Sequence, residues 1–328
     1  MIAKKLTVCY LLFMLWGTCV MAQTKPIPRD TTFNTPRVYQ QIHKAYPYAT
    51  IANDSVPKEL IAERDIVYTT LPETPYGKRD LHLDVFRPAK KGIYPTVFMI
   101  HGGGWRSGTR LMEQPMAELL AAKGFVTITV EYQLELEAVY PAAVYNIKSA
   151  IRYIKNNAAK YNIDTSKMAI EGTSAGGQLA SLVGMTGNNP HFEGDQGNTG
   201  AGTKLQAIID IDGVIDFMAP NSLNLKRAPD SPDVMWLGGT FEQKPLIWKE
   251  ASPIFWATDK TTPPIIFLNS GFSRFHAGQD ELIAMMNEWG IYSEVQKFNV
   301  QMHPFWLFHP WVDETVSYIS DFLHKTLK

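Results

Sequence analysis

A serine flanked by two glycines, at the junction of a strand-like run and a helix-like run, constrains the fold of this chain more than any other feature. Gly172, Ser174 and Gly176 stand between the apolar run 168–171 and the helical stretch 176–185. Such glycines are needed where the chain turns sharply from strand to helix, because a Cβ there would strike the neighbouring elements. The turn lifts the serine hydroxyl clear of the sheet, at the positive end of the next helix. The sequence therefore predicts that Ser174 is a nucleophile.

Short apolar runs alternate with helical stretches along most of the chain. The predicted strands cover residues 63–70, 81–86, 96–100, 125–130, 168–171, 207–211, 265–268 and 294–298, and the predicted helices cover residues 112–122, 142–159, 176–185, 278–289 and 312–325. This alternation predicts an α/β protein with a mostly parallel central sheet and helices on both faces. Ligands of such sheets bind beyond the carboxyl ends of the strands. Residues 216–260, rich in Pro, Trp and Leu, are expected to form an insertion over the carboxyl ends of the strands.

Residues 1–22 have the three parts of an export signal: Lys4 and Lys5, an apolar run at 6–16, and small residues up to Ala22. The apolar run is short for the roughly 20 residues that a membrane-spanning helix needs. We therefore expect cleavage after Ala22, export across the inner membrane into the periplasm, and no integral membrane segment in the mature chain. Lipidation at Cys19 is a minor alternative, since no aliphatic residue stands three positions before it.

The composition of the remaining chain argues against several classes of site. Both cysteines, Cys9 and Cys19, lie within the expected signal. The mature protein would therefore have no thiol for a disulfide or a zinc site, and we expect no cofactor and no metal. Without the two signal lysines, 29 basic and 32 acidic residues leave a formal charge of −3, which argues against a nucleic-acid partner. Residues 23–57 lack periodicity and are predicted to be an irregular lead to one catalytic domain at 58–328.

Three consecutive glycines, between a histidine and a tryptophan, follow the predicted strand 96–100. Glycines let bare N–H groups approach a ligand closely. If Ser174 adds to an ester carbonyl, the oxygen becomes negative, and each donor already aimed at it lowers the barrier by about 3 to 4 kcal/mol. We assign this oxyanion hole to the backbone N–H groups of Gly103, Gly104 and Ala175. A phosphate-binding turn is the alternative, although the lysine and Ser/Thr of a P-loop are missing.

Several motifs together resemble a known family. His101 to Trp105, Glu131-Tyr132, Tyr140-Pro-Ala-Ala143 and Gly172 to Ala180 recur in this order in bacterial carboxylesterases related to hormone-sensitive lipase, in the α/β-hydrolase superfamily. The chain is most similar to bifunctional feruloyl and acetyl-xylan esterases of glycan-degrading bacteria. The resemblance implies an α/β-hydrolase fold and ester hydrolysis without a cofactor. It also implies that the substrates are acetyl, feruloyl or methyl esters of plant polysaccharides or oligosaccharides.

The general base is expected near the C-terminus, because the order along the chain in this fold is serine, acid, histidine. His303 follows the last predicted strand by a few residues and precedes an aromatic residue, as the catalytic histidine does in the family. His309 is the alternative, and a lone histidine at that position is more often structural. We therefore expect His303 to take the proton of Ser174.

The acid of the expected triad is where the resemblance fails. In the family an aspartate follows the seventh strand, but in the corresponding stretch 269–280 of this chain Ser273 takes its place. Asp280, at the end of that stretch, is the expected acid, and Asp216, just past the sixth strand, is the alternative. A dyad without an acid also remains open. So does a catalytically impaired glycan-binding relative, and a serine peptidase of the same fold is a further rival.

Three residues are expected to contact the substrate: Trp105, Arg274 and His276. Trp105 follows a strand end, where its flat ring could stack on a sugar, whereas most of the other tryptophans are expected to pack a lid. Arg274 and His276 lie in the loop that should border the active site. A guanidinium fork suits a carboxylate, which makes uronic-acid polymers such as pectin plausible carriers of the ester. A surface arginine paired to a local carboxylate is the equally open alternative.

Overall fold

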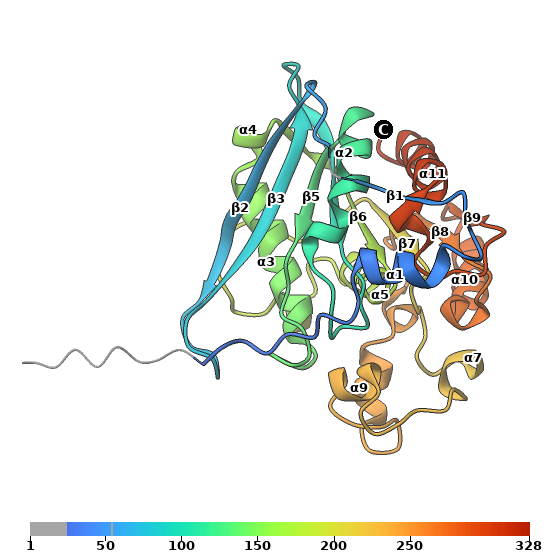
Figure 1. Cartoon of the computed structure of the whole chain (residues 1–328). Coiled ribbons are helices and arrows are strands. Elements are labelled where there is room, and N and C mark those ends of the chain that lie inside the picture. Colours follow the sequence, from blue (N-terminus) through green and yellow to red (C-terminus); the bar gives the residue numbers. More distant parts are fainter. Residues whose placement is uncertain (1–24, 54) are drawn as a thin grey trace, which may run out of the picture.

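The computed structural model describes residues 25–53 and 55–328, so the expected export signal lies outside the described residues. An eight-stranded sheet with the order β2-β3-β5-β4-β6-β7-β8-β9 forms its centre (Figure 1). Its strands are β2 (Leu60–Leu71), β3 (Arg79–Pro88), β4 (Tyr94–Ile100), β5 (Val126–Val130), β6 (Ile163–Thr173), β7 (Ala207–Ile211), β8 (Ile265–Asn269) and β9 (Ser293–Lys297). β3 pairs antiparallel with β2 and β5, and the remaining pairs are parallel, so the mostly parallel sheet is confirmed.

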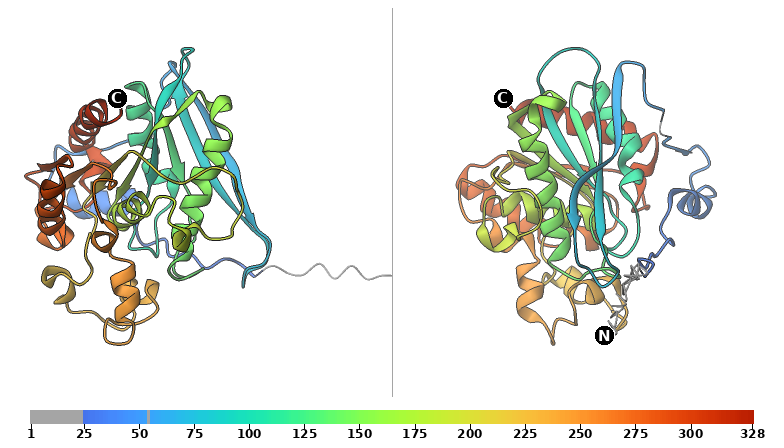
Figure 2. Two further views of the ribbon diagram at one scale, coloured as in Figure 1. Left: turned by 180° about the vertical axis from the view of Figure 1, so that it is seen from behind. Right: turned by 90° about the vertical axis from the view of Figure 1, so that its left-hand side faces the viewer.

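The central strands are apolar because helices cover both of their faces. Every residue of β5, β7 and β8 is buried. One buried hydrophobic cluster packs α3 (Ala142–Asn156), α5 (Ala175–Met185) and α10 (Gln279–Trp289) on one face. A second packs α2 (Gln114–Ala122) and α11 (Trp311–Thr326) on the other (Figure 2). The predicted three-layer arrangement is therefore confirmed.

The segment 23–57, predicted to be irregular, is partly regular where the structure describes it. It contains the helix α1 (Thr35–Ile42) and the short strand β1 (Thr50–Ile51), which pairs with β10 (Phe308–His309). Asn34 caps α1, accepting a hydrogen bond from the Arg37 N–H at 2.9 Å. An Asn cap and an early proline are the sequence signals for this eight-residue helix, in which Val38 is the buried residue.

The predicted insertion lies beyond the carboxyl ends of the parallel strands, at the bottom of Figure 1. It contains α7 (Pro220–Leu223), α8 (Pro232–Trp236), α9 (Pro245–Glu250) and η2 (Pro253–Trp256), each with a proline in its first turn. Trp236 and Trp248 are fully buried within it, as expected of residues that pack a lid. The remaining short helices are α4 (Ala158–Tyr161), α6 (Pro190–Glu193), η1 (Arg110–Glu113), η3 (Ser273–His276) and η4 (Phe305–Leu307).

Among residues 25–53 and 55–328, no helix combines the length and the apolar character needed to cross a bilayer.

Candidate active site

The turn between β6 and α5 has the strained geometry that the glycine spacing predicts. Ser174 adopts φ +55°, a left-handed conformation that is rare for a residue with a side chain. A Cβ added to Gly172 would lie 2.0 Å from the carbonyl oxygen of Gly176, and one added to Gly176 would lie 1.9 Å from that of Ile100. No side chain fits at either glycine, so the sharp turn depends on both.

The glycine-rich loop after β4 presents backbone N–H groups beside Ser174. Gly102 N–H donates to Thr173 Oγ1 at 3.0 Å, which ties the loop to the turn. Within the described ranges, the N–H groups of Gly103 and Gly104 make no hydrogen bond. Ala175 opens α5, so its N–H has no partner within the helix. Three donors are thus available to a negatively charged oxygen, as the sequence predicts.

A continuous hydrogen-bond chain joins the serine, a histidine and an aspartate. His303 Nε2 lies 2.7 Å from Ser174 Oγ, and its Nδ1 lies 2.9 Å from Asp212 Oδ2. The second carboxylate oxygen of Asp212 accepts the Ser270 N–H at 2.8 Å, so both oxygens have partners. Asp212 is fully buried and immediately follows β7. The structure therefore brings Ser174 and His303 together as predicted, with Asp212 as their carboxylate.

The prediction that Asp280, or alternatively Asp216, is the acid of the triad is wrong. Asp280 lies exposed in the first turn of α10. Asp216 is half-buried and accepts the Met218 N–H at 2.8 Å. Neither makes a hydrogen bond or ion pair with His303 in the part of the chain that the structure describes.

Asp212 reaches the imidazole because of the strand order. β7 pairs directly with β6, with Ile211 opposite Thr173, and Ser174 N–H donates to the Ile211 carbonyl at 2.7 Å. The residue after β7 therefore emerges beside Ser174, where β7 and β6 end together. The sequence signal that could have found it was a carboxylate one position past the predicted strand 207–211.

The alternative base, His309, belongs to another part of the structure. It pairs with Thr50 in the strand ladder, and its Nδ1 contacts Asp313 Oδ2 at 2.6 Å. His309 is therefore engaged locally, as expected of a structural histidine.

The environment of His303 favours the neutral imidazole. Burial lowers the pKa of His303 below its usual value, and the hydrogen bond and charge of Asp212 oppose this shift without reversing it. The Phe275 ring stacks on the imidazole at 3.6 Å between centroids and 9° between planes, and Trp306 meets it edge-on at 5.1 Å. Both rings restrict the imidazole to the orientation in which it faces the serine.

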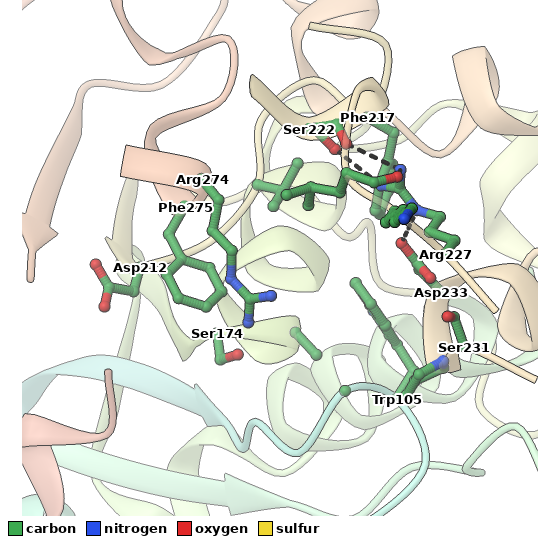
Figure 3. A pocket seen from close by; sticks show the side chains of 16 residues that line it. Trp105, Ser174, Asp212, Phe217, Ser222, Arg227, Ser231, Asp233, Arg274 and Phe275 are labelled. Atoms are coloured by element: carbon green, nitrogen blue, oxygen red, sulfur yellow. Dashed lines mark hydrogen bonds and ion pairs between the residues drawn. The ribbon is translucent and has the colours of Figure 1, made fainter. Parts of the chain in front are cut away.

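A cavity of about 280 Å³ opens in front of Ser174 (Figure 3). It is lined by Gly104, Trp105, Ser174, Ala175, Asp212, Val214, Phe217, Ser222, Leu225, Lys226, Arg227, Ser231, Pro232, Asp233, Arg274 and Phe275. Trp105 stacks on Trp236 at 4.9 Å and donates its indole N–H to Gln178 Oε1 at 3.0 Å. Trp105 and Arg274 line the cavity as predicted, whereas His276 does not and is a wrong assignment.

No three His, Cys, Asp or Glu side chains of residues 25–53 and 55–328 are grouped so that they could hold a metal ion.

Known proteins share this fold and parts of this sequence. Esterase LipC of Mycobacterium tuberculosis is 28% identical over 192 residues, which are 57% of this chain and 47% of LipC. Carboxylesterase NlhH of the same species is 30% identical over 129 residues, which are 39% of each chain. This chain thus spans less than half the length of these relatives.

Two solved structures are similar over most of the chain. A bifunctional GH43-CE protein of Bacteroides eggerthii has a TM-score of 0.66 and 25% identity, covering 80% of this chain and 38% of its own. A truncated carbohydrate esterase from gut microbiota has a TM-score of 0.68 and 23% identity, covering 83% and 97%. The second likeness shows the shared fold alone. The BD-FAE family model matches residues 83–287, more than half of the 328-residue chain, and the chain therefore belongs to the BD-FAE family of α/β hydrolases.

Proposed function

We propose that the protein is a serine carboxylesterase that hydrolyses acyl or methyl esters of plant polysaccharides through an acyl-enzyme. The hydrogen-bond chain from Ser174 through His303 to Asp212 carries the proposal. Its order along the chain, serine then acid then histidine, is that of α/β-hydrolase esterases. A complete triad favours catalysis over the alternative of an impaired glycan-binding relative.

In the acylation step, Ser174 Oγ attacks the ester carbonyl carbon while His303 Nε2 takes its proton across the 2.7 Å hydrogen bond. The carbonyl oxygen becomes an oxyanion and accepts hydrogen bonds from Gly103, Gly104 and Ala175. His303 then gives the proton to the departing alkoxide. The alcohol leaves, and the acyl group stays on Ser174.

In the deacylation step, water replaces the alcohol. His303 takes a proton from the water as its oxygen attacks the acyl carbon, and then returns that proton to Ser174 Oγ. The products are the free acid and the regenerated enzyme. Asp212 holds Nδ1–H of the imidazole throughout and stabilises the imidazolium that forms.

The esterase names of the relatives support ester hydrolysis. The name of the carbohydrate-esterase neighbour and the aromatic wall at Trp105 support carbohydrate esters as substrates. A sugar ring can pack its apolar face on such an aromatic wall. We also propose that the protein acts in the periplasm, on the strength of residues 1–22 alone.

Covalent labelling tests the nucleophile directly. A fluorophosphonate should label the wild-type protein at Ser174, and Ser174→Ala should abolish both labelling and at least about 99.9% of the hydrolysis of p-nitrophenyl acetate. Retention of more than a tenth of the rate by Ser174→Ala would contradict the proposal.

Product release identifies the substrate. Acetate, methanol and ferulate are measured after incubation with acetylated xylan, methylated pectin and feruloylated arabinoxylan. Release of none of them, together with cleavage of aminoacyl p-nitroanilides, would favour the peptidase alternative.

A further inference from the structure

We propose that the active-site cavity contains a carboxylate subsite at Arg274, supported by Lys226 at the rim, so that the esters hydrolysed are carried by acidic sugars such as uronic acids. The inference rests on the proposed esterase function and names its substrate class. The subsite lies in the same cavity as Ser174.

The guanidinium of Arg274 is directed at the substrate space rather than at the protein. Arg274 lies in η3, after β8, and Figure 3 shows its guanidinium extending beside the Phe275 ring toward Ser174. The ring of Phe275 supports it, with the guanidinium carbon 4.2 Å from the ring centroid. Among residues 25–53 and 55–328, the structure gives Arg274 no hydrogen bond and no ion pair. Its donors are therefore available to a ligand.

Arg227, on the opposite wall, shows by contrast what an arginine with a structural role looks like. Its guanidinium bonds to Asp233 at 2.6 Å and to the Ser222 carbonyl at 2.9 Å, and it stacks over Trp248. These contacts hold the segment between α7 and α8. The same segment carries Lys226, which is exposed at the cavity and has no ion pair within the described part of the chain.

The charges of the cavity do not balance within the protein. With His303 neutral, the two carboxylates of the cavity, Asp212 and Asp233, face three cations, Arg227, Arg274 and Lys226. One positive charge is left over, although the whole chain has a formal charge of −1. An anionic substrate would complete this charge balance.

A carboxylate suits this position better than a neutral group. The planar guanidinium presents parallel N–H donors that match the two oxygens of a carboxylate. The location of the triad acid also permits the arrangement. Asp212 provides the carboxylate that pairs with His303, so the loop after β8 does not need to supply one. That loop carries Ser273, which has no charge that would compete with a substrate for Arg274.

Specificity between matched substrates tests the subsite. The kcat/KM values are measured on O-acetylated oligogalacturonate and on O-acetylated xylo-oligosaccharide of equal length. The wild-type protein should prefer the acidic substrate, and Arg274→Gln should lower the acidic-to-neutral ratio by about tenfold to a hundredfold, the range of a hydrogen bond to a charged group. Arg274→Lys should recover only part of that ratio, and Lys226→Gln should lower it less than Arg274→Gln.

The control is Lys91→Gln, which removes one exposed lysine from the turn before β4. This turn lies at the amino end of the parallel strands, whereas the cavity lies beyond their carboxyl ends. It should leave the ratio unchanged. An unchanged ratio in Arg274→Gln, or a wild-type preference for the neutral oligosaccharide, would overturn the subsite. A stronger preference for a sulfated xylo-oligosaccharide than for the uronate would overturn its assignment to carboxylates.

A binding measurement separates this inference from the esterase proposal. Calorimetry with Ser174→Ala and unesterified oligogalacturonate should give a Kd that weakens by about tenfold or more when Arg274→Gln is added. That result would support the subsite even if the wild-type protein hydrolysed no ester and resisted fluorophosphonate, which would refute only the catalytic function. Equal Kd values in the two proteins would overturn the subsite alone.

Discussion

Asp212 is held by neighbours from two other stretches of the chain, the end of β8 and the loop that carries His303. It pairs with His303, accepts the Ser270 N–H from the loop after β8, and donates its own N–H to the Leu268 carbonyl at 3.1 Å. Its φ of +53° is left-handed, a conformation that aspartate tolerates better than most residues. These contacts aim one carboxylate oxygen at the imidazole and occupy the other.

Replacing this carboxylate by an amide tests its role. Asp212→Asn should lower kcat on p-nitrophenyl acetate by about 10⁴, the loss seen when the acid of a triad becomes an amide and the imidazole takes the wrong tautomer. Asp280→Asn is the matched control, because it makes the same change on an exposed helix-end carboxylate. It should leave kcat within about twofold and cost about 0.3 to 1 kcal/mol of stability at most. Normal turnover in Asp212→Asn would contradict the assignment.

The pH dependence of kcat/KM follows from the environment of His303. The imidazole must be neutral to accept the serine proton, so activity is lost as the pH falls through its pKa. Burial holds the pKa of His303 below its ordinary value of 6.5, so the acid limb of the profile should lie below pH 6.5. This limb reports the pKa of the free enzyme. A limb at or above pH 6.5 would contradict the prediction.

At the level of secondary-structure elements, the N-terminal segment supports the loop that carries His303. β1 pairs with β10, Ala52 N–H donates to the Leu307 carbonyl at 3.0 Å, and Gln301 N–H donates to the Tyr46 hydroxyl at 3.0 Å. Tyr46 also packs edge-on against Trp311 at 5.3 Å. The segment therefore contacts the loop on both sides of His303 along the chain, at Gln301 and at Leu307.

Truncating Tyr46 tests this support. Tyr46→Ala should lower the free energy of unfolding by about 1 to 3 kcal/mol and reduce kcat more than it raises KM, because it loosens the base without touching the cavity. Tyr48→Ala is the matched control, since Tyr48 contacts the same Trp311 but is 64% exposed. Urea unfolding and steady-state kinetics measure both effects. Equal losses in the two variants would mean that Tyr46 has no special role.

The insertion depends on aromatic packing rather than on its own helices. α7, α8 and α9 have four to six residues each, too short to be stable alone. Phe217 lies 5.6 Å from Trp105 and 5.9 Å from Trp248, so aromatic rings connect the oxyanion loop to the insertion. The packing of these three rings therefore fixes the position of the cavity walls.

At the scale of the whole molecule, three carboxyl groups are buried close to the strand that leads to Ser174 and to its neighbour β7. Glu113, Glu171 and Asp210 are fully buried, and burial raises the pKa of Glu113 to about 8 and that of Asp210 to about 7. The Glu171 carboxyl oxygens have no hydrogen-bond partner among the described residues, and burial raises its pKa well above the usual range. The folded protein therefore holds protons here that the unfolded chain releases.

This difference makes stability depend on pH. The pKa of Glu113 is raised from 4.5 to about 8 on folding, so its stabilising contribution is complete below pH 4.5 and is lost as the pH rises to 8. The limiting slope is about 1.4 kcal/mol per pH unit. Glu113→Gln should flatten the decline in the free energy of unfolding between pH 5 and 8. Urea unfolding of this variant and of the exposed control Glu59→Gln measures it, and parallel curves for all three proteins would contradict it.

The features read correctly from the sequence are those whose causes lie within about ten neighbouring residues. Gly172 and Gly176 are required by steric contacts in a single turn, and the glycines after β4 by their exposed N–H groups. The alternation of strands and helices follows from hydrophobic periodicity, which predicted β7 to the residue. The order of the triad along the chain placed the base near the C-terminus, and its position after the last predicted strand, as in the family, favoured His303 over His309.

The triad acid and the N-terminal support of the loop that carries His303 depend on contacts between distant segments. Asp212 reaches His303 because β7 lies next to β6, and sequence spacing does not encode that adjacency. Position in the chain favours Asp280, but the first turn of α10 leaves its side chain exposed to solvent. A carboxylate acts on the imidazole only within hydrogen-bond reach, a distance fixed by how the strands are ordered and where their loops fold back.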